Sequence, residues 1–145
     1  MGMNRASKTF KSRIEGLHPK LILWLGYMLA TSPVDFFISE GVRTTEKQKE
    51  LYSKGRRGIK GEAIVTNRDG VNKKSEHQVK EDGYGYAVDI YYVGWNANTD
   101  PNGSDPRWKE LDKCAKMCAE KLGITMRHGL DWKNPYDPPH HELVP

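Results

Sequence analysis

Hydrophobic positions toward the C-terminal part of the chain recur with the period of a helix. The apolar side chains fall at steps of three and four residues, at Trp108, Leu111, Ala115, Cys118 and Leu122. This spacing places them in one stripe that can pack against a sheet. Asp105 is a helix cap and Pro106 suits a first turn, whereas Gly123 is a common stop. A helix is therefore predicted over residues 105–123.

Three further helices are predicted from apolar periodicity and from the residues that begin and end them. They cover residues 7–15, 18–32 and 44–55. Ser7 caps the first helix, and Gly16 ends it. The second stops before Pro33. The third begins after a Thr cap and closes at Gly55.

Two segments have the composition of strands, being rich in β-branched and aromatic residues. They cover residues 35–42 and 86–93. Side chains alternate along a strand, so Ala87, Asp89 and Tyr91 share one face. The other face of this strand carries only large apolar or aromatic side chains: Tyr86, Val88, Ile90 and Tyr92.

The remaining segments are mainly loops. Residues 56–74 are rich in Gly and basic residues, and we expect a long loop with a short strand at residues 62–65. Residues 129–145 are expected to be a loop followed by a short strand. Helices and strands mix without a regular β–α–β alternation, which favours an α+β fold in a single domain, residues 1–145.

The charge of the chain favours an anionic partner. With 145 residues, a formal net charge of +4 and a pI near 9.0, the chain is mildly basic. Nucleic acid, anionic lipid and bacterial cell wall all fit this charge, and charge alone does not choose among them.

Cysteine usage and hydropathy argue against a disulfide-stabilised protein and against a membrane-spanning one. Cys114 and Cys118 lie four residues apart on one helix face, where we expect two small core side chains rather than a disulfide framework. The apolar stretch 21–30 is too short to span a bilayer and is expected to be a buried helix. With no export signal found, we expect the chain to stay in the cytoplasm until something else releases it.

Candidate chemistry begins with Asp89, a carboxylate inside an apolar strand. A buried carboxylate needs a cation, hydrogen bonds or a metal, and Ala87 beside it leaves room for one. The alternative is an edge-strand Asp that faces water.

The segment 136–143, YDPPHHEL, supplies further candidates. Two consecutive prolines favour polyproline II, which has three residues per turn. In that geometry Asp137 and His140 lie on the same side, and His141 points away, toward solvent or a neighbouring element. Together with His77, the pair Asp89 and His140 would make an open zinc site, beside which Asp137 would serve as general base. By spacing alone, surface or hydrogen-bonded histidines remain an alternative.

Four ordered segments resemble the M15 zinc peptidases, which cleave peptides of the bacterial cell wall. Ser75–Glu76–His77 and Gly85–Tyr86–Ala87–Val88–Asp89 match the family's S-x-H and G-x-A-x-D motifs. Asp137–Pro138–Pro139–His140 matches its C-terminal carboxylate and histidine. The segment SEGVRTTEKQKELYSKG is similar to a further family segment. The chain is most similar to phage endolysins that are L-alanyl-D-glutamate peptidases, over residues 16–144.

The resemblance implies a fold, a cofactor and a set of roles. The fold would be a small antiparallel sheet flanked by helices, like the hedgehog domain and D-Ala-D-Ala peptidases. One Zn²⁺ would be held by His77, Asp89 and His140. Asp137 would act as general base, and Arg43 would stabilise the oxyanion or hold a substrate carboxylate. The implied substrate-binding residues are Gln48, Ser75 and Trp132.

The implied setting is that of a phage endolysin, a monomer that stays in the host cytoplasm until its release to the cell wall. Its partner would be peptidoglycan, with neither nucleic acid binding nor membrane insertion. The alternatives are a D,D-carboxypeptidase or dipeptidase of the same family, a non-catalytic zinc-binding module, and a basic nucleic-acid-binding domain using KGRRGIKG.

The chain departs from the family pattern at two places. Eleven residues separate His77 from Asp89 where six are usual, and Lys80–Tyr84 is the apparent insertion. We expect a loop to absorb it without moving either ligand. His141 stands where an aromatic residue such as Phe is common, and we expect it to fill that space.

Overall fold

The structure, a computed structural model, describes residues 7–145 and contains one four-stranded antiparallel sheet with strands in the order β1-β2-β4-β3. The α-helices are α1 Lys8–Arg13, α2 Pro19–Thr31, α3 Thr45–Ser53 and α4 Pro106–Leu122. The strands are β1 Phe36–Glu40, β2 Ala87–Tyr92, β3 Met126–His128 and β4 His140–Leu143, and a short 3-10 helix covers Gly129–Asp131. The expected α+β fold with a small antiparallel sheet flanked by helices is confirmed.

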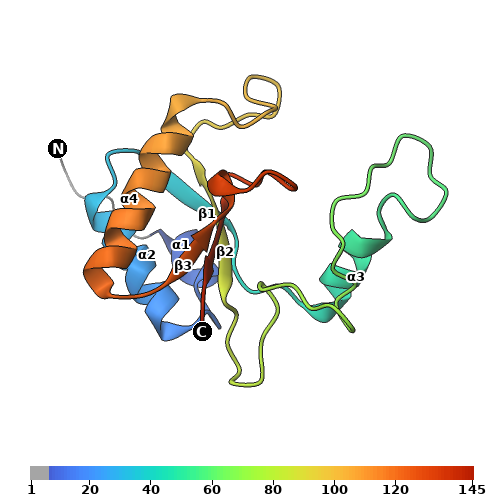
Figure 1. Ribbon diagram of the computed structural model, residues 1–145, viewed down its shortest axis with the longest axis horizontal. Coiled ribbons are helices and arrows are strands. Elements are labelled where there is room, and N and C mark those ends of the chain that lie inside the picture. The colour runs from blue at the N-terminus through green and yellow to red at the C-terminus, as the bar shows by residue number, and fades with distance from the viewer. Residues whose placement is uncertain (1–6) are drawn as a thin grey trace.

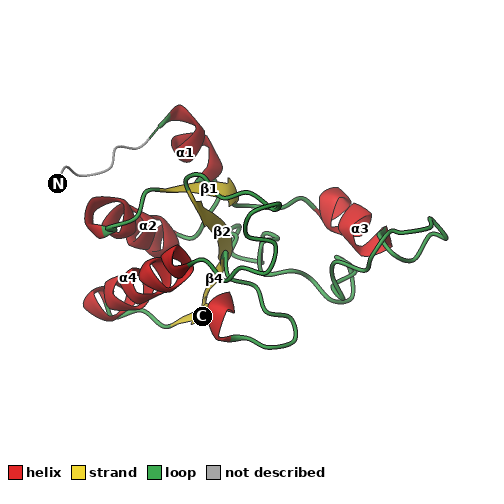
Figure 2. Cartoon of the chain, turned by 90° about the horizontal axis from the view of Figure 1, so that it is seen from above, coloured by secondary structure: helices red, strands yellow, loops and turns green. Residues whose placement is uncertain are grey.

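One face of the sheet is covered by α2 and α4, and this interface is the hydrophobic core (Figures 1 and 2). The apolar face predicted for β2 points into it, with Val88 and Ile90 fully buried. Trp24 on α2 is also fully buried, and its indole N–H donates to the carbonyl of Ala115 on α4 at 2.9 Å. The core therefore fixes one side of the sheet and leaves the opposite face for other contacts.

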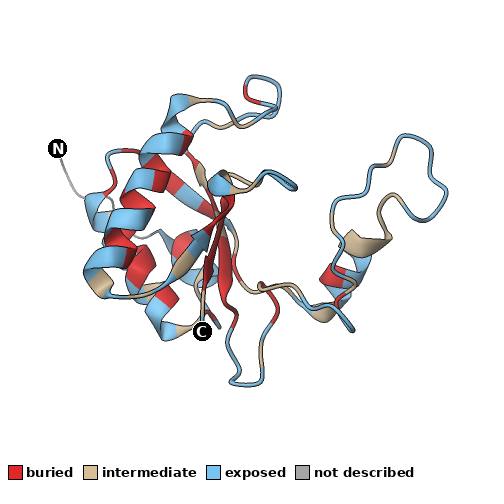
Figure 3. Ribbon diagram, in the orientation of Figure 1, coloured by how far each residue is buried: buried red, intermediate tan, exposed pale blue. Residues whose placement is uncertain are grey.

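On the opposite side, α3 and the long loop after it form a lobe that projects from the sheet (Figure 1). Most of this lobe is exposed, with a small buried patch on α3 (Figure 3). Within residues 7–145, no helix is both long and apolar enough to cross a membrane.

Helix ends follow the predicted chemistry. Ser7, Thr44 and Asp105 accept hydrogen bonds from backbone amides of the first turns. Gly123 closes α4 in the left-handed conformation, with φ +65°. The first helix is shorter than predicted, because α1 ends at Arg13 and residues 14–16 form a turn.

Two strand predictions need correction. Residues 62–65 are loop, with Ile64 and Val65 more than half exposed, because this part of the chain lies away from any strand with which it could pair. Conversely, β3 was not predicted. It has only three residues, too few for a period-2 pattern to show, and it depends on pairing with β4.

Candidate metal and catalytic site

The sheet face away from the core brings His77, Asp89 and His140 together. Asp89 lies in β2 and pairs in register with His140 in β4. His77 comes from the loop before β2 and is buried. One potential ligand atom from each of the three residues lies within 4.8 Å of the others. The three residues predicted from sequence are therefore adjacent in space.

Each histidine has its outer ring nitrogen fixed by a hydrogen bond. His77 Nδ1 lies 2.9 Å from the carbonyl oxygen of Gly41, and His140 Nε2 lies 2.8 Å from Oε1 of Glu142. Both partners can only accept when Glu142 is ionised, so both outer nitrogens carry the proton. In neutral rings the lone pairs are then on His77 Nε2 and His140 Nδ1.

Those two lone pairs converge on a carboxylate oxygen. His77 Nε2 is 3.3 Å and His140 Nδ1 is 3.2 Å from Asp89 Oδ1. Acceptor atoms at these distances require a cation among them, which can be a proton or a metal ion. Two imidazoles and a carboxylate, with the distal nitrogens held, form a donor set that fits Zn²⁺.

With protons alone in the site, Asp89 and His140 each shift the pKa of the other. Burial works to raise the pKa of Asp89, but the neighbouring His77 and His140 hold it far below its usual range. Burial works to lower the pKa of His140, but its hydrogen bonds to Asp89 and Glu142 raise it to about 9. A metal that binds here must therefore displace protons.

Asp137 lies beside this group without being among its converging atoms. Its Oδ2 is 3.9 Å from His140 Nδ1. Burial, followed by the negative charge of Asp89, raises the pKa of Asp137 above its usual value. A carboxylate with a raised pKa is suited to accepting and returning a proton.

The predicted proximity of Asp137 and His140 holds, but the polyproline II geometry behind it is wrong. The amide of His140 donates to the carbonyl of Asp137 at 3.1 Å, so Pro138 and Pro139 occupy the centre of a tight turn. Polyproline II has no such internal hydrogen bond. A hydrogen-bonded turn formed here instead and also brings Asp137 to His140.

His141 points into the core. Of the two expected positions, facing solvent or packing against a neighbouring element, the structure shows the second. It is buried, its ring lies 5.3 Å from that of Trp24, and its Nδ1 is 2.8 Å from Nδ1 of His128. It therefore fills space between the sheet and α2, away from Asp89.

Arg43 is held at the edge of the site. Its Nε and Nη2 donate to the two carboxylate oxygens of Glu40 at 3.0 and 2.7 Å, and its Nη1 donates to Gln48 Oε1 at 2.7 Å. Its backbone amide donates to the carbonyl of His77 at 2.8 Å. Arg43 is thus tied to His77 through its backbone, while Glu40 and Gln48 hold its side chain in place.

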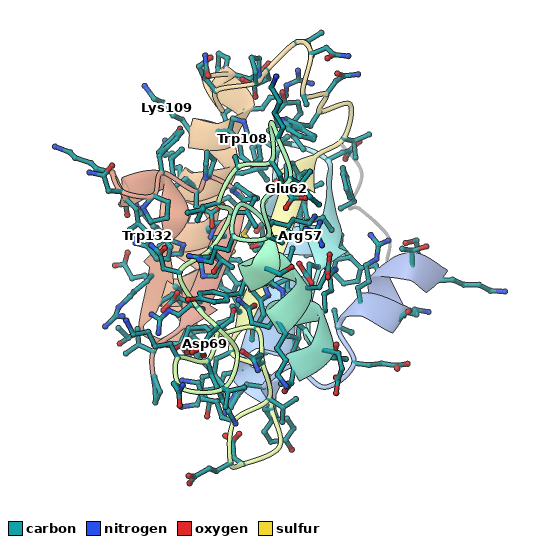
Figure 4. The ribbon with its side chains drawn as sticks, turned by 90° about the vertical axis from the view of Figure 1, so that its right-hand side faces the viewer. Arg57, Glu62, Asp69, Trp108, Lys109 and Trp132 are labelled. Atoms are coloured by element: carbon teal, nitrogen blue, oxygen red, sulfur yellow. The ribbon has the colours of Figure 1, made fainter. Side chains whose placement is uncertain are left out.

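The three residues expected to bind substrate occupy different positions. Gln48 is fully buried and lies behind Arg43, so any effect on substrate would act through that side chain. Ser75 accepts from the amide of His77 at 3.2 Å and lines a cavity. The ring of Trp132 lies 5.1 Å from that of His140. In Figure 4, which views this side of the molecule, Trp132 and Trp108 lie in different parts of it.

The apparent insertion is a closed excursion of the chain. The amide of Lys80 donates to the carbonyl of Tyr84 at 2.9 Å, so both ends of the segment meet. It belongs to the yellow-green loop at the bottom of Figure 1. The expectation that a loop absorbs the extra residues agrees with this geometry.

Sequence reasoning missed several residues of the site. Glu142 lies two positions after His140 in β4, so strand alternation would have placed both on one face. Glu40 pairs in register with Asp89, which no sequence signal indicated. Tyr91 lies near three carboxylates: burial, Asp89, Asp137 and Glu40 together raise its pKa to about 12.

Fold and site together define a small α+β sheet that carries a candidate His-Asp-His metal site. A sequence profile described as phage L-alanyl-D-glutamate peptidase matches residues 1–144. The chain therefore belongs to the phage L-alanyl-D-glutamate peptidase family, which confirms the resemblance noted in the sequence.

The chain is similar to a curated enzyme and to a solved structure, among others. Peptidoglycan L-alanyl-D-glutamate endopeptidase CwlK of Bacillus subtilis is 32% identical over 123 residues, which cover 80% of this chain and 65% of CwlK. The crystal structure of Serratia marcescens L-Ala D-Glu endopeptidase ChiX has a TM-score of 0.65 at 23% identity, covering 94% of this chain and 87% of that one. The likeness to ChiX shows a shared fold.

Proposed function

We propose that this chain is a zinc-dependent endopeptidase that hydrolyses the L-alanyl-D-glutamate bond of peptidoglycan stem peptides. The observation that carries the proposal is the convergence of His77, Asp89 and His140 on one point, with Asp137 beside them. Membership of the family and the likeness to CwlK support the choice of bond.

His77 Nε2, Asp89 and His140 Nδ1 would hold the ion. When bound, Zn²⁺ supplies a Lewis acid that polarises the scissile carbonyl and makes a water more acidic. Asp137 then receives the proton of the attacking water and delivers it to the leaving amine. The position of Asp137 beside His140, with Oδ2 3.9 Å from Nδ1, suits both transfers.

Arg43 would stabilise the negative charge that develops on the carbonyl oxygen. Its bidentate contact with Glu40 uses one proton on Nε and one on Nη2, so a second proton on Nη2 is left for a substrate oxygen. A cation fixed in place before the reaction needs no reorganisation as charge develops.

The basic charge of the chain is concentrated in the lobe. Residues 54–74 contain seven Lys or Arg and two Asp or Glu, a surplus larger than the net charge of +4 of the whole chain. We infer that the lobe favours contact with an anionic wall. In this proposal the protein is the endolysin of a phage, acts as a monomer, and stays in the host cytoplasm until release for host lysis.

The direct test is mass spectrometry of fragments released from purified peptidoglycan. The proposal predicts two kinds of fragment. One begins with D-Glu at its new N-terminus, and the other is the sugar-linked L-Ala with a free carboxyl group. Asp137→Asn is the matched variant and should retain its metal. It should release fragments roughly two to four orders of magnitude more slowly, because a general base usually contributes that much to the rate.

Other outcomes would contradict the proposal. Release of free D-Ala would instead indicate a D,D-carboxypeptidase. Absence of any fragment from a metal-loaded protein would indicate a non-catalytic zinc-binding module.

A further inference from the structure

Two cavities lie at opposite ends of strand β2, with Asp89 between them. One, near 610 Å³, is lined by Ser75 and by charged side chains of the loop before β2, among them Glu76, Lys80 and Asp82. We call it the charged cavity. The other, near 370 Å³, begins at Asp137 and is walled by aromatic rings. We call it the aromatic groove.

Contacts among its lining residues hold the walls of the aromatic groove in place. The ring of Tyr91 lies 4.6 Å from that of Trp95 and 5.4 Å from that of Trp108. On the far side, the Tyr136 hydroxyl donates to the carbonyl of Gly103 at 2.7 Å, which joins the two loops that border the groove. Tyr136 is 44% exposed, so part of the aromatic surface is open to a ligand.

The chemistry of the substrate indicates what this groove would hold. In peptidoglycan the first stem residue is L-Ala, and its amine is joined to the lactyl group of N-acetylmuramic acid. An enzyme that cuts after this L-Ala has a sugar one residue away on the acyl side. D-Glu and the later stem residues, which carry carboxylates and an amine, lie on the other side.

We propose that the aromatic groove binds the N-acetylmuramoyl sugar, while the charged cavity receives the stem peptide beyond D-Glu. Sugars present apolar C–H faces together with hydroxyl groups, which suits aromatic rings interspersed with a few polar groups. The charged cavity suits the ionised peptide in the same way. This inference rests on the proposed function, because it takes the L-Ala–D-Glu bond as the site of cleavage.

Distances along the strand agree with this placement. Tyr91 lies two residues beyond Asp89 on the same face, which corresponds to roughly 7 Å. One extended L-Ala residue spans about 3.5 Å, and the lactyl linkage adds a comparable length. A sugar on the acyl side of a scissile bond held at Asp89 and Asp137 can therefore reach Tyr91 and Trp95.

The experiment compares two substrates that share the same stem peptide. One carries N-acetylmuramic acid on the L-Ala nitrogen, and the other carries only an acetyl group there. The wild-type protein is expected to cleave the sugar-bearing substrate with a kcat/KM higher by about tenfold or more, equivalent to about 1.4 kcal/mol. Trp95→Ala should bring that ratio close to one, and Trp95→Phe should restore most of it.

Tyr27→Ala is the matched control, because Tyr27 is an exposed aromatic residue on α2, on the other side of the sheet. It should leave the ratio at the wild-type value. A wild-type ratio near one, or a Trp95→Ala variant that slows both substrates equally, would overturn the groove assignment while leaving the proposed function intact. Failure to cleave either substrate at the L-Ala–D-Glu bond would overturn both.

Direct binding provides a second readout that needs no turnover. N-acetylmuramoyl-L-alanine, which contains no scissile bond, should bind the wild-type protein with saturable heat in isothermal titration calorimetry, whereas N-acetyl-L-alanine should not. Loss of saturable binding in Trp95→Ala with retention in Tyr27→Ala supports the groove. Equal binding of the two ligands contradicts it.

Discussion

The backbone of Gly129 lies directly against that of Asp137. The amide of Asp137 donates to the carbonyl of Gly129 at 3.0 Å, and a Cβ at position 129 would overlap the carbonyl oxygen of Asp137. The absence of a side chain at Gly129 therefore sets how closely the proposed general base approaches the metal-site residues.

Gly129→Ala should displace Asp137 by about an ångström and lower the rate by about a hundredfold, the typical cost of such a misplacement. Metal content should stay at the wild-type level, since none of the three converging residues is touched. Gly26→Ala is the control, because a Cβ there meets nothing within 4 Å. Full activity in Gly129→Ala, measured on purified peptidoglycan, would show that this contact does not position Asp137.

The two adjacent histidines should behave differently when each is replaced. His140→Ala should lose zinc, because it removes a converging nitrogen. His141→Ala should keep zinc and cost about 1–3 kcal/mol of stability as a buried side chain is lost. His141→Phe should cost less, because it refills the space beside Trp24. Zinc stoichiometry of the purified variants is the measurement, and zinc retained by His140→Ala but lost by His141→Ala would reverse the assignment.

Most of the site was predictable because its chemistry is carried by motifs with local spacing. Asp89 stands out as a carboxylate in an apolar strand, and His140 follows Asp137 within one turn of chain. Glu40 and Tyr91 were missed for a different reason. Their roles depend on the pairing of β1 with β2 and on the shape of the sheet face, which no local pattern encodes.

The fold was predictable where elements carry their own signals and less so where they depend on partners. Helix α4 has a stripe, a cap and a terminal Gly, and it was placed correctly. Strand β3 exists through its pairing with β4. Pro138 and Pro139 form a turn rather than polyproline II because the Asp137 carbonyl accepts a hydrogen bond from the His140 amide. The composition of the segment does not predict this hydrogen bond.

Glu142 should tune the affinity of the metal site through His140. Its Oε1 lies 2.8 Å from His140 Nε2, so its negative charge orients the ring and makes the opposite nitrogen more basic. Glu142→Gln should weaken zinc binding roughly 10–100-fold, the usual cost of losing such a partner. Competition with a chromogenic chelator measures this directly. An unchanged zinc affinity would show that the contact has no such effect.

The buried pair His128 and His141 should make the fold sensitive to mild acid. Burial lowers the pKa of both groups, and that of His141 well below its ordinary value. A histidine with a depressed pKa contributes stability that is present above its unfolded value of about 6.5 and is lost as the pH falls. Two protonated rings would also place like charges on nitrogens 2.8 Å apart.

In the presence of a chelator, the free energy of unfolding should therefore decrease as the pH falls from about 7 to about 5. His141→Phe should have a shallower slope, because one of the two groups no longer titrates. Denaturant unfolding of the wild-type and variant proteins at a series of pH values measures both slopes. Equal slopes would mean that this pair does not control the acid response.

Cleavage of the L-Ala–D-Glu bond should depend on a bound metal ion. The wild-type protein should be stripped with a chelator, checked by elemental analysis, and assayed by mass spectrometry for release of fragments cut between L-Ala and D-Glu. No release is expected from the metal-free protein, and release should recover on addition of one equivalent of Zn²⁺. Full release from a preparation shown to be metal-free would contradict it.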